Sequence, residues 1–343
     1  MLVLQISDIG KILKQVGYKT FFQELMQTLE SDFKDWDKFD KSPRLATHVK
    51  DGVIELMPVS NEELYSFKYV NGHPKNPKSN KFTVMATGQL SQVKTGEPLL
   101  FSEMTILTAL RTAATSALAA KYLAHPKAEV LAFIGTGAQS EFQYLAFSQI
   151  FNIKTLRYYD IDDNAMKKFA TNMQKFDVQL VPCNSAKEAV LGAQLITTMT
   201  ADKRNQTILT KDMITQPVFI NGVGGDCPGK TELEKELVES STVVVEFLEQ
   251  SKIEGEIQQL RDDYVCTELH EVFNKQKTIN VQTHGTVIYD SVGFALEDYS
   301  VLRYVYGLAK KLNVGTHLEL IPNLEDVKNL YSLIDDKKEG HQK

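Results

Sequence analysis

The first hundred residues combine one helical repeat with several short alternating runs. Phe21, Leu25 and Leu29 follow one another at helical spacing, which predicts a helix with one buried face. Apolar and polar residues then alternate at 52–57, 64–70 and 81–86. A turn at residues 95–98 separates the run that begins at Val84 from the next apolar run, and it predicts a hairpin. We therefore expect a mostly antiparallel sheet with a flanking helix.

A helix with almost no charge is predicted at residues 104–120. Its apolar residues recur at helical spacing, and Arg111 is its single charged residue. Ser102 is the candidate N-cap, with Glu103 in the first turn. A lone guanidinium in an otherwise uncharged helix is the first unusual feature of the chain.

Beyond residue 126, bare apolar runs alternate with helical patterns. Strands are expected at 130–134, 154–159, 178–181, 195–199, 218–220 and 243–247. Apolar strands separated by helices are typical of a parallel sheet that is covered on both faces. A last helix is expected at about 292–312, and a polar tail at 331–343 is expected to be poorly ordered. The predicted fold class is α/β.

Length and composition exclude several classes of protein. A chain of 343 residues favours two domains. With 38 basic and 44 acidic residues, the net charge of -6 gives no attraction to a nucleic-acid backbone. The sequence has no apolar run of the roughly 18 residues that a membrane span needs, and its start lacks a signal-peptide pattern, so a cytoplasmic location is expected. Cys183, Cys227 and Cys266 have no CxxC spacing, which argues against disulfides and zinc.

A dinucleotide-binding fingerprint stands where the first parallel strand passes into a helix. Gly135 permits a tight turn, and Gly137 lets the backbone approach a pyrophosphate at the helix N-terminus. Ser140 occupies the position of the third glycine, so the hexamer alone is a weak match. Asp160 ends the next predicted strand, where an acid accepts hydrogen bonds from the adenosine ribose. The alternative is an ordinary turn followed by an ordinary aspartate.

Three cations occur in apolar surroundings. Arg111 requires an anionic partner, because an unpaired buried guanidinium costs several kcal/mol. That partner is either a carboxylate of this chain, in a structural ion pair, or the carboxylate or phosphate of a ligand. Arg44 and Lys68, each taken alone, are expected to be solvated or snorkelling bases. Together with Arg111, they favour an anion-binding site.

The glycine-rich segment after residue 220 contains Asp226. Ligands bind at the carboxyl ends of parallel strands, so Asp226 is a candidate general base or counter-ion to an ammonium. The alternative is a turn aspartate that caps a helix beginning near Thr231. Cys227 has no histidine near it in sequence, which argues against a thiol nucleophile. His125 and His284 are expected to be structural or exposed, and no metal site is predicted.

Three motifs resemble the ornithine cyclodeaminase/mu-crystallin superfamily. They are LTALRTAATS at 107–116, IGTGAQ at 134–139 and GGDCPGKTEL at 224–233. The resemblance runs from about Arg44 to Leu312, and the third motif is similar to that of the ornithine cyclodeaminase branch. It implies a Rossmann-type dinucleotide-binding domain at 121–299 and an α+β substrate-binding and dimerisation domain at 1–120. The C-terminal helix, at about 300–330, would return to the latter domain.

The resemblance also implies roles for individual residues. Asp226 matches the catalytic acid–base. The positions that match substrate-binding residues are Arg44, Glu55, Lys68, Arg111, Asp226 and Gly293. The positions that match NAD-binding residues are Thr83, Arg111, Gly135, Gly137, Ala138, Gln139, Asp160, Thr200, Gly222, Val223, Gly224, Lys230 and Val292. Whether Glu55 or Asp226 orients the distal amine of the substrate is left open.

The implied activity is NAD-dependent conversion of L-ornithine to L-proline and ammonia by a homodimer. One alternative is an imine reductase or amino-acid dehydrogenase with the same fold, and another is a non-catalytic nucleotide- or hormone-binding protein. Asp160 favours NAD, because its carboxylate would repel the 2′-phosphate of NADP. Arg157, three residues earlier, is a nearby cation that would weaken this preference.

Overall fold

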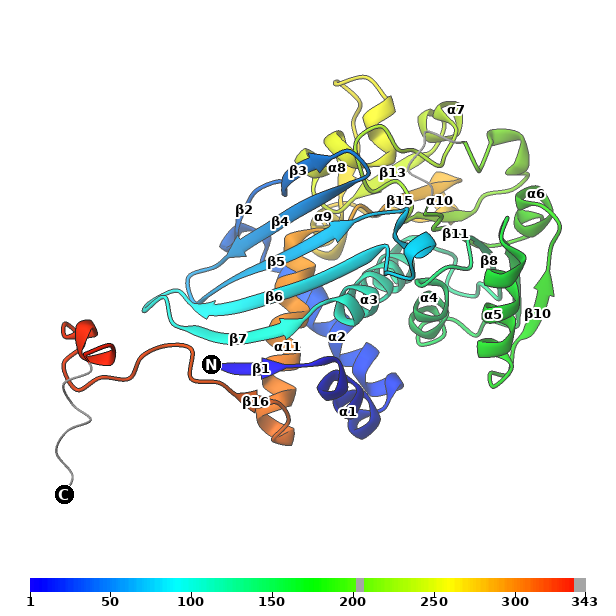
Figure 1. Cartoon of the computed structure of the whole chain (residues 1–343). Coiled ribbons are helices and arrows are strands. Elements are labelled where there is room, and N and C mark those ends of the chain that lie inside the picture. Colours follow the sequence, from blue (N-terminus) through cyan, green and yellow to red (C-terminus); the bar gives the residue numbers. More distant parts are fainter. Residues whose placement is uncertain (202–206, 336–343) are drawn as a thin grey trace.

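The structure is a computed structural model that describes residues 1–201 and 207–335 (Figure 1). Within these residues the strands form two eight-stranded sheets. No described helix combines the length and apolar character that crossing a membrane requires. Most of the polar tail, residues 336–343, lies outside the described residues.

The first sheet is mostly antiparallel, as the alternating runs predicted. Its order is β16-β1-β7-β6-β5-β4-β2, with β3 paired to β4. Strands β4 to β7 pair antiparallel, whereas β1, which was not predicted, runs parallel to β7. The strands are β1 (Leu2–Leu4), β2 (Asp40–Lys41), β3 (Leu45–Val49), β4 (Gly52–Ser60), β5 (Leu64–Gly72), β6 (Val84–Gln92), β7 (Pro98–Glu103) and β16 (Thr316–His317).

Helices cover one face of this sheet, which we call its inner face (Figure 1). The last helix, α11, packs against β4, β5, β6 and α2. Alternate residues of β4 and β5 are buried there, and they include Glu55 and Lys68. The surrounding helices are α1 (Ile6–Val16), α2 (Tyr18–Lys34), η1 (Trp36–Lys38), η2 (Asn76–Ser79), α3 (Thr105–Leu123) and α11 (Ala295–Leu312).

The second sheet is parallel throughout, as predicted. Its order is β10-β9-β8-β11-β12-β15-β13-β14. Strands β9 and β10 are added on one side of β8, and the later strands are added on its other side, so the order switches between β8 and β11. Ligands bind at such a switch point in open α/β sheets. The strands are β8 (Val130–Ile134), β9 (Thr155–Tyr159), β10 (Gln179–Pro182), β11 (Leu195–Thr198), β12 (Phe219–Gly222), β13 (Thr242–Val245), β14 (Thr267–Glu268) and β15 (Val287–Asp290).

Short helices connect these strands and confirm the Rossmann-type α/β arrangement. They are α4 (Ser140–Phe147), α5 (Asp163–Met173), α6 (Ala186–Val190), η3 (Lys211–Met213), α7 (Lys235–Glu239), α8 (Leu248–Glu254), η4 (Glu256–Gln259), α9 (Leu269–Phe273) and α10 (Val281–His284). A last turn, η5 (Leu330–Leu333), follows β16.

Helix α3 lies between the two sheets, which explains its lack of charge. It contacts β6 of the first sheet and β12 and β15 of the second. Its buried residues belong to one hydrophobic core that also includes Phe21 and Phe133, from the two parts of the chain. A helix that is covered on all sides must be apolar on all sides. Lys121 is exposed near the end of the helix, whereas Arg111 is buried in its middle, so the position of Arg111 depends on partners inside the protein.

The predicted N-cap of α3 was wrong. Ser102 is the last but one residue of β7 and pairs with Gly88, so its backbone is already committed to the sheet. The carboxylate of Glu103 caps the helix instead, because it accepts hydrogen bonds from the N–H groups of Ile106 at 3.0 Å and Leu107 at 3.3 Å. The predicted capping residue, Ser102, is therefore one position away from Glu103, whose side chain caps the helix.

The last helix is shorter than either predicted range. It begins at Ala295, after an extended segment, and ends at Leu312 rather than continuing toward residue 330. Asn313 closes it with a left-handed backbone (φ 54°), and Gly315 turns the chain with φ 106°. The chain then returns to the edge of the first sheet as β16, which pairs with β1.

Candidate functional site

Arg111 is paired inside the protein with two carboxylates of α11. Its Nη1 lies 2.7 Å from Glu297, and its Nε lies 3.1 Å from Asp298. The side chain is buried, so the structural ion pair that we considered as an alternative does exist. Glu297 and Asp298 engage Nη1 and Nε, which leaves Nη2 as the guanidinium nitrogen that neither carboxylate holds.

Lys68 reaches the same carboxylate from the first sheet. Its Nζ lies 2.9 Å from Asp298, and only 1% of the residue is exposed. The expectation of a solvated or snorkelling base is therefore wrong for this residue. Burial, together with the positive charge of Arg111, lowers the pKa of Lys68 to about 8.

Arg44 joins the first sheet to helix α8 and to the start of α11. It lies between β2 and β3, and it forms ion pairs with Glu55 at 3.2 Å and Glu254 at 3.0 Å. Its Nη2 also donates to the carbonyls of Val292 at 2.7 Å and Gly293 at 2.6 Å. Like Lys68, Arg44 is buried rather than solvated.

The three predicted cations thus converge on the segment from Val292 to Asp298. Gly293, near the start of this segment, connects two of the charged groups, because its N–H donates to Glu246 at 2.7 Å while its carbonyl accepts from Arg44. We refer to these cations and their carboxylates as the charge cluster. The carboxylates that the sequence reasoning did not identify are Glu246, Glu254, Glu297 and Asp298. Two adjacent acidic residues at the start of the predicted last helix were the available signal for Glu297 and Asp298.

Two acidic groups in the charge cluster have raised pKa values. Burial raises the pKa of Glu254 to about 7, despite the neighbouring Arg44. Burial and the adjacent Glu246 raise the pKa of Glu297 to about 8.

The glycine-rich loop after β8 has the geometry of a phosphate-binding turn. Gly135 adopts φ 100°, and an added Cβ would lie 2.8 Å from the carbonyl oxygen of Met199. Gly137 and Ala138 are exposed at the start of α4, while Gln139 is half-buried. The Oγ of Ser140 donates to the carbonyl of Gly137 at 2.9 Å. This bond braces the turn, and the small Ser140 side chain is fully buried at the position of the third glycine.

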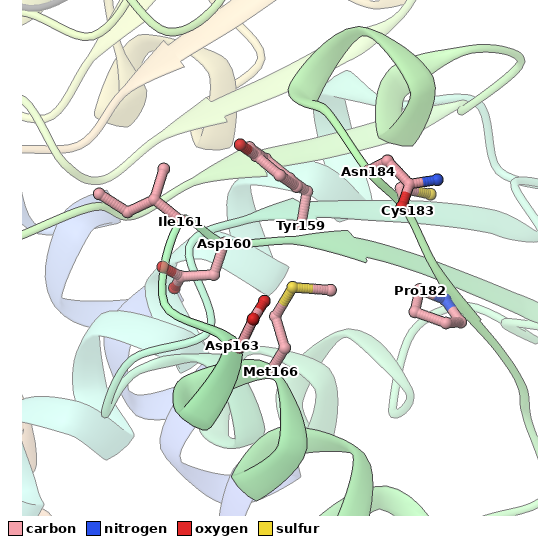
Figure 2. Close-up of a pocket in the computed structure, with 8 residues that line it drawn as sticks. All are labelled: Tyr159, Asp160, Ile161, Asp163, Met166, Pro182, Cys183 and Asn184. Atoms are coloured by element: carbon pink, nitrogen blue, oxygen red, sulfur yellow. The ribbon is translucent and has the colours of Figure 1, made fainter.

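Asp160 lies at the end of β9 and braces this loop. Its Oδ2 accepts hydrogen bonds from the N–H of Thr136 at 2.6 Å and from the Thr136 hydroxyl at 3.1 Å. The same residue lines a cavity of about 380 Å³, and Figure 2 shows Asp163 and Met166 beside it. The remaining lining residues are Tyr159, Ile161, Pro182, Cys183 and Asn184.

The side chain of Arg157 is bound to the end of α6 and not to the Asp160 cavity. Its Nε donates to the carbonyl of Ala189 at 3.0 Å, and its Nη2 donates to that of Glu188 at 2.6 Å. These are C-terminal carbonyls of α6, a position that favours a cation. The side chain is therefore held by α6 and does not line the cavity next to Asp160.

Asp226 lies in the long loop after β12, near the same edge of the sheet. Its side chain is 46% exposed, and its Oδ1 lies 3.4 Å from Nζ of Lys230. The helix-capping alternative is wrong, because the next helix, α7, begins only at Lys235 and its N-cap is Glu234. The strand carries the chain straight into an irregular loop here, which leaves the carboxylate without a helix to cap.

Lys230 and Glu232 tie this loop to the end of β11. Lys230 donates to the carbonyl of Thr200 at 2.8 Å, and the N–H of Thr200 donates to Glu232 at 2.9 Å. A Cβ on Gly224 would overlap the carboxylate of Glu232. Several predicted cofactor positions therefore share one packed region at the carboxyl edge.

The structure places the other predicted cofactor positions in or next to both sheets. Val223 and Gly224 donate their N–H groups to the carbonyl of Thr198, at 2.9 Å and 3.1 Å. Gly222 ends β12. Thr83 precedes β6, and its carbonyl accepts from the N–H of His73 at 2.8 Å. Among residues 1–201 and 207–335, no group of three or more His, Cys, Asp or Glu side chains is arranged to hold a metal ion.

Comparisons with known proteins agree on one family. The model of the ornithine cyclodeaminase/mu-crystallin family matches residues 9–313. The chain is 49% identical over 331 residues to an ornithine cyclodeaminase from Agrobacterium fabrum (strain C58), and this alignment covers 96% of the chain and 94% of the relative. A solved lysine cyclodeaminase, described with recognition of L-lysine, L-ornithine and L-2,4-diaminobutyric acid, has a TM-score of 0.91 at 26% identity over 97% of this chain and 99% of its own. An archaeal alanine dehydrogenase dimer with bound NAD has a TM-score of 0.85 at 29% identity, covering 94% and 99%.

Proposed function

Because this chain belongs to the ornithine cyclodeaminase/mu-crystallin family, we propose that it is a lyase that converts L-ornithine into L-proline and ammonia with NAD as a catalytic cofactor. The observation that carries the proposal is the 49% identity to an ornithine cyclodeaminase over 96% of the chain. The match therefore includes both sheets and the loop that holds Asp226. A cytoplasmic location remains a prediction.

The residues after β8 and β9 fit a dinucleotide. Gly135 supplies a turn that a side chain would obstruct, and exposed backbone at Gly137 and Ala138 is available to a pyrophosphate. Asp160 presents a carboxylate to the adjacent cavity, where a ribose would donate its hydroxyl hydrogens. When bound, NAD supplies a reversible two-electron acceptor for the α-carbon of the substrate. Residues 121–299 are thus assigned to the cofactor.

The charge cluster binds the α-carboxylate of the substrate. Nη2 of Arg111 is directed by the two carboxylates that hold the rest of the guanidinium, and Gly293 lies against it. Lys68 adds a second positive charge through the shared Asp298. Pre-organised cations of this kind fix the orientation of a carboxylate without moving during the reaction. Residues 1–120, together with the part of α11 from residue 300 onward, are assigned to the substrate and to dimerisation.

Asp226 accepts the proton of the substrate's ammonium. Asp226 is more accessible than Glu55, because the Glu55 side chain is buried and already forms an ion pair with Arg44. A half-exposed carboxylate is accessible to a substrate and can accept a proton before the distal amine closes the ring. We therefore assign the acid–base role to Asp226 and the support of Arg44 to Glu55.

The active form is a homodimer that packs through the outer face of the first sheet, the face opposite α11. Large apolar side chains of this face are exposed in the single chain: Leu45, Tyr65, Tyr69 and Met85. An exposed apolar surface of this kind marks an interaction site. The solved alanine dehydrogenase that this chain resembles is described as a dimer, which supports the same arrangement.

Product analysis with L-ornithine and substoichiometric NAD tests the proposed reaction. A cyclodeaminase forms proline and ammonia in equal amounts, over many turnovers for each NAD, and accumulates no NADH. Ornithine that carries deuterium at its α-carbon should keep the label in proline. NADH formed in step with product would overturn the proposal and favour an amino-acid dehydrogenase instead.

A further inference from the structure

A tight turn follows directly after Asp226. The carbonyl of Cys227 accepts a hydrogen bond from the N–H of Lys230 at 3.1 Å, and Gly229 adopts φ 78°. Pro228 followed by a glycine with positive φ is the residue pair that type II turns favour. Lys230, the last residue of the turn, lies 3.4 Å from the Asp226 carboxylate. The orientation of this turn therefore sets the position of that carboxylate.

A side chain from outside the loop, that of Gln258 in η4, holds the turn. Its Oε1 accepts a hydrogen bond from the N–H of Gly229 at 2.7 Å. Its Nε2 donates to the carbonyls of Cys227 at 3.3 Å and Lys230 at 3.0 Å. A primary amide can do this because it carries both a donor and an acceptor. Three of the four turn residues are thus bound through main-chain atoms.

The segment that carries Gln258 also holds Arg44. Nε2 of Gln258 donates to the carbonyl of Glu254 at 2.9 Å, and the side chain of Glu254 pairs with Arg44 at 3.0 Å. Gln250, one turn earlier, accepts from the N–H of Arg44 at 2.7 Å. Burial raises the pKa of Glu254 to about 7, and the negative charge of Asp226 contributes to this rise. Helix α8 and the turn η4 therefore connect Arg44 to the Asp226 loop.

We propose that Gln258 is a positioning residue that fixes the carboxylate of Asp226 relative to Arg44, and hence to a substrate bound there. This inference rests on the proposed acid–base role of Asp226. A general base must lie within hydrogen-bond reach of the proton that it accepts. A displacement of about 1 Å can lower the rate by about a hundredfold. Because Gln258 acts through the main chain of the turn, its loss leaves the reacting groups present but misplaces one of them.

A double-mutant cycle tests whether Gln258 acts through Asp226. Gln258→Met keeps the length of the side chain but removes its hydrogen bonds, so kcat for proline formation should fall at least tenfold. The KM for ornithine should change less than threefold, because the charge cluster is intact. In the Asp226→Asn background the same substitution should change kcat less than twofold, because no base remains to be positioned. An equal fall in both backgrounds, or an unchanged kcat in the wild-type background, would overturn the proposal.

Gln259→Met is the matched control. Gln259 belongs to the same short helix, but its Nε2 donates to the carbonyls of Leu233 at 3.1 Å and Glu256 at 3.0 Å, outside the turn. Its kcat should stay within twofold of the wild type, and equal losses for the two methionine variants would overturn the proposal. Gln258→Glu is a second variant of the same length, which keeps an acceptor for Gly229 but loses the donor to the carbonyls. It too should lower kcat in the wild-type background alone.

Hydrogen exchange of the full-length protein tests the same contact without any catalysis. Amide exchange in the peptide that contains residues 227–230 should become at least tenfold faster in Gln258→Met and should not change in Gln259→Met. Unchanged exchange in both variants would overturn the proposal. A wild type that forms no proline from ornithine would instead overturn the proposed reaction, so the two failures give different results.

Discussion

Gly293 lies directly against the guanidinium of Arg111. A Cβ added to Gly293 would lie 2.8 Å from Nη1 and 2.9 Å from Nη2, and the backbone adopts φ 79°. The carbonyl of Gly293 also accepts a hydrogen bond from Arg44, and its N–H donates to Glu246. The backbone between β15 and α11 therefore fixes two of the three cations that we assign to the substrate carboxylate.

Replacing Gly293 with alanine should displace Arg111. We expect Gly293→Ala to raise the KM for ornithine at least tenfold, since the added methyl group occupies space next to the guanidinium. Gly285→Ala is the matched control, because Gly285 has a similar φ of 74° but nothing within 4 Å of an added Cβ. Both variants should lose stability, because a residue with a Cβ is strained at a positive φ. Steady-state kinetics measures the change in KM, and thermal melting measures the loss of stability. An unchanged KM for Gly293→Ala would contradict the assignment of Arg111 to the substrate carboxylate.

Removing the basicity of Asp226 should reduce turnover. Asp226→Asn keeps the shape of the side chain but cannot accept the proton, so kcat should fall by at least about a hundredfold. Binding of NAD should change little, because the reacting proton belongs to the substrate. Asp263→Asn, at an exposed carboxylate that pairs with Arg261, serves as the control and should retain its turnover. Near-normal kcat for Asp226→Asn would exclude the acid–base role.

Cofactor preference should favour NAD by at least tenfold over NADP. The carboxylate of Asp160 lines the cavity where a 2′-phosphate would have to lie, and like charges at close range repel. Arg157 is held by the carbonyls of α6, so Arg157→Ala should leave this preference unchanged. Titration of both cofactors by fluorescence is the measurement. Equal affinity of the wild type for NAD and NADP would contradict the role of Asp160. A strong loss of NADP binding in Arg157→Ala would show that Arg157 contacts the cofactor.

The raised pKa of Glu254 predicts a specific dependence of stability on pH. Burial raises this pKa from 4.5 to about 7, so between these values the unfolded chain releases a proton that the folded chain keeps. The contribution of Glu254 to stability therefore decreases as pH rises, by about 3 kcal/mol in total. Glu254→Gln cannot titrate and should gain stability relative to wild type over this interval, with no further gain well above pH 7.

Denaturant unfolding at several pH values measures this difference. The exposed Glu249 lies on the same helix, and Glu249→Gln should follow the wild type at every pH. Parallel stability curves for wild type and Glu254→Gln would mean that Glu254 ionises normally in the folded protein.

Local patterns in the sequence determined most of the elements and several candidate residues. The helical period around Arg111 and the bare apolar runs such as Val130–Ile134 gave the correct types of element, because periodicity reports which sides of an element are buried. The turn at Gly135 and the acid at Asp160 were found for a related reason, since both stand at fixed places in a strand–turn–helix unit. The strand Leu2–Leu4 was missed because three residues contain no detectable period.

Only the tertiary structure decided how the charges are paired. Arg111 and its partner Glu297 are 186 residues apart in the chain, and Arg44 and Glu254 lie in different parts of the molecule. No local pattern connects such residues, because their contact arises where α11 packs against α3 and where α8 meets the segment between β2 and β3. Burial of a charge predicts that a partner exists, but the identity of that partner depends on which distant elements the fold brings within a few ångströms.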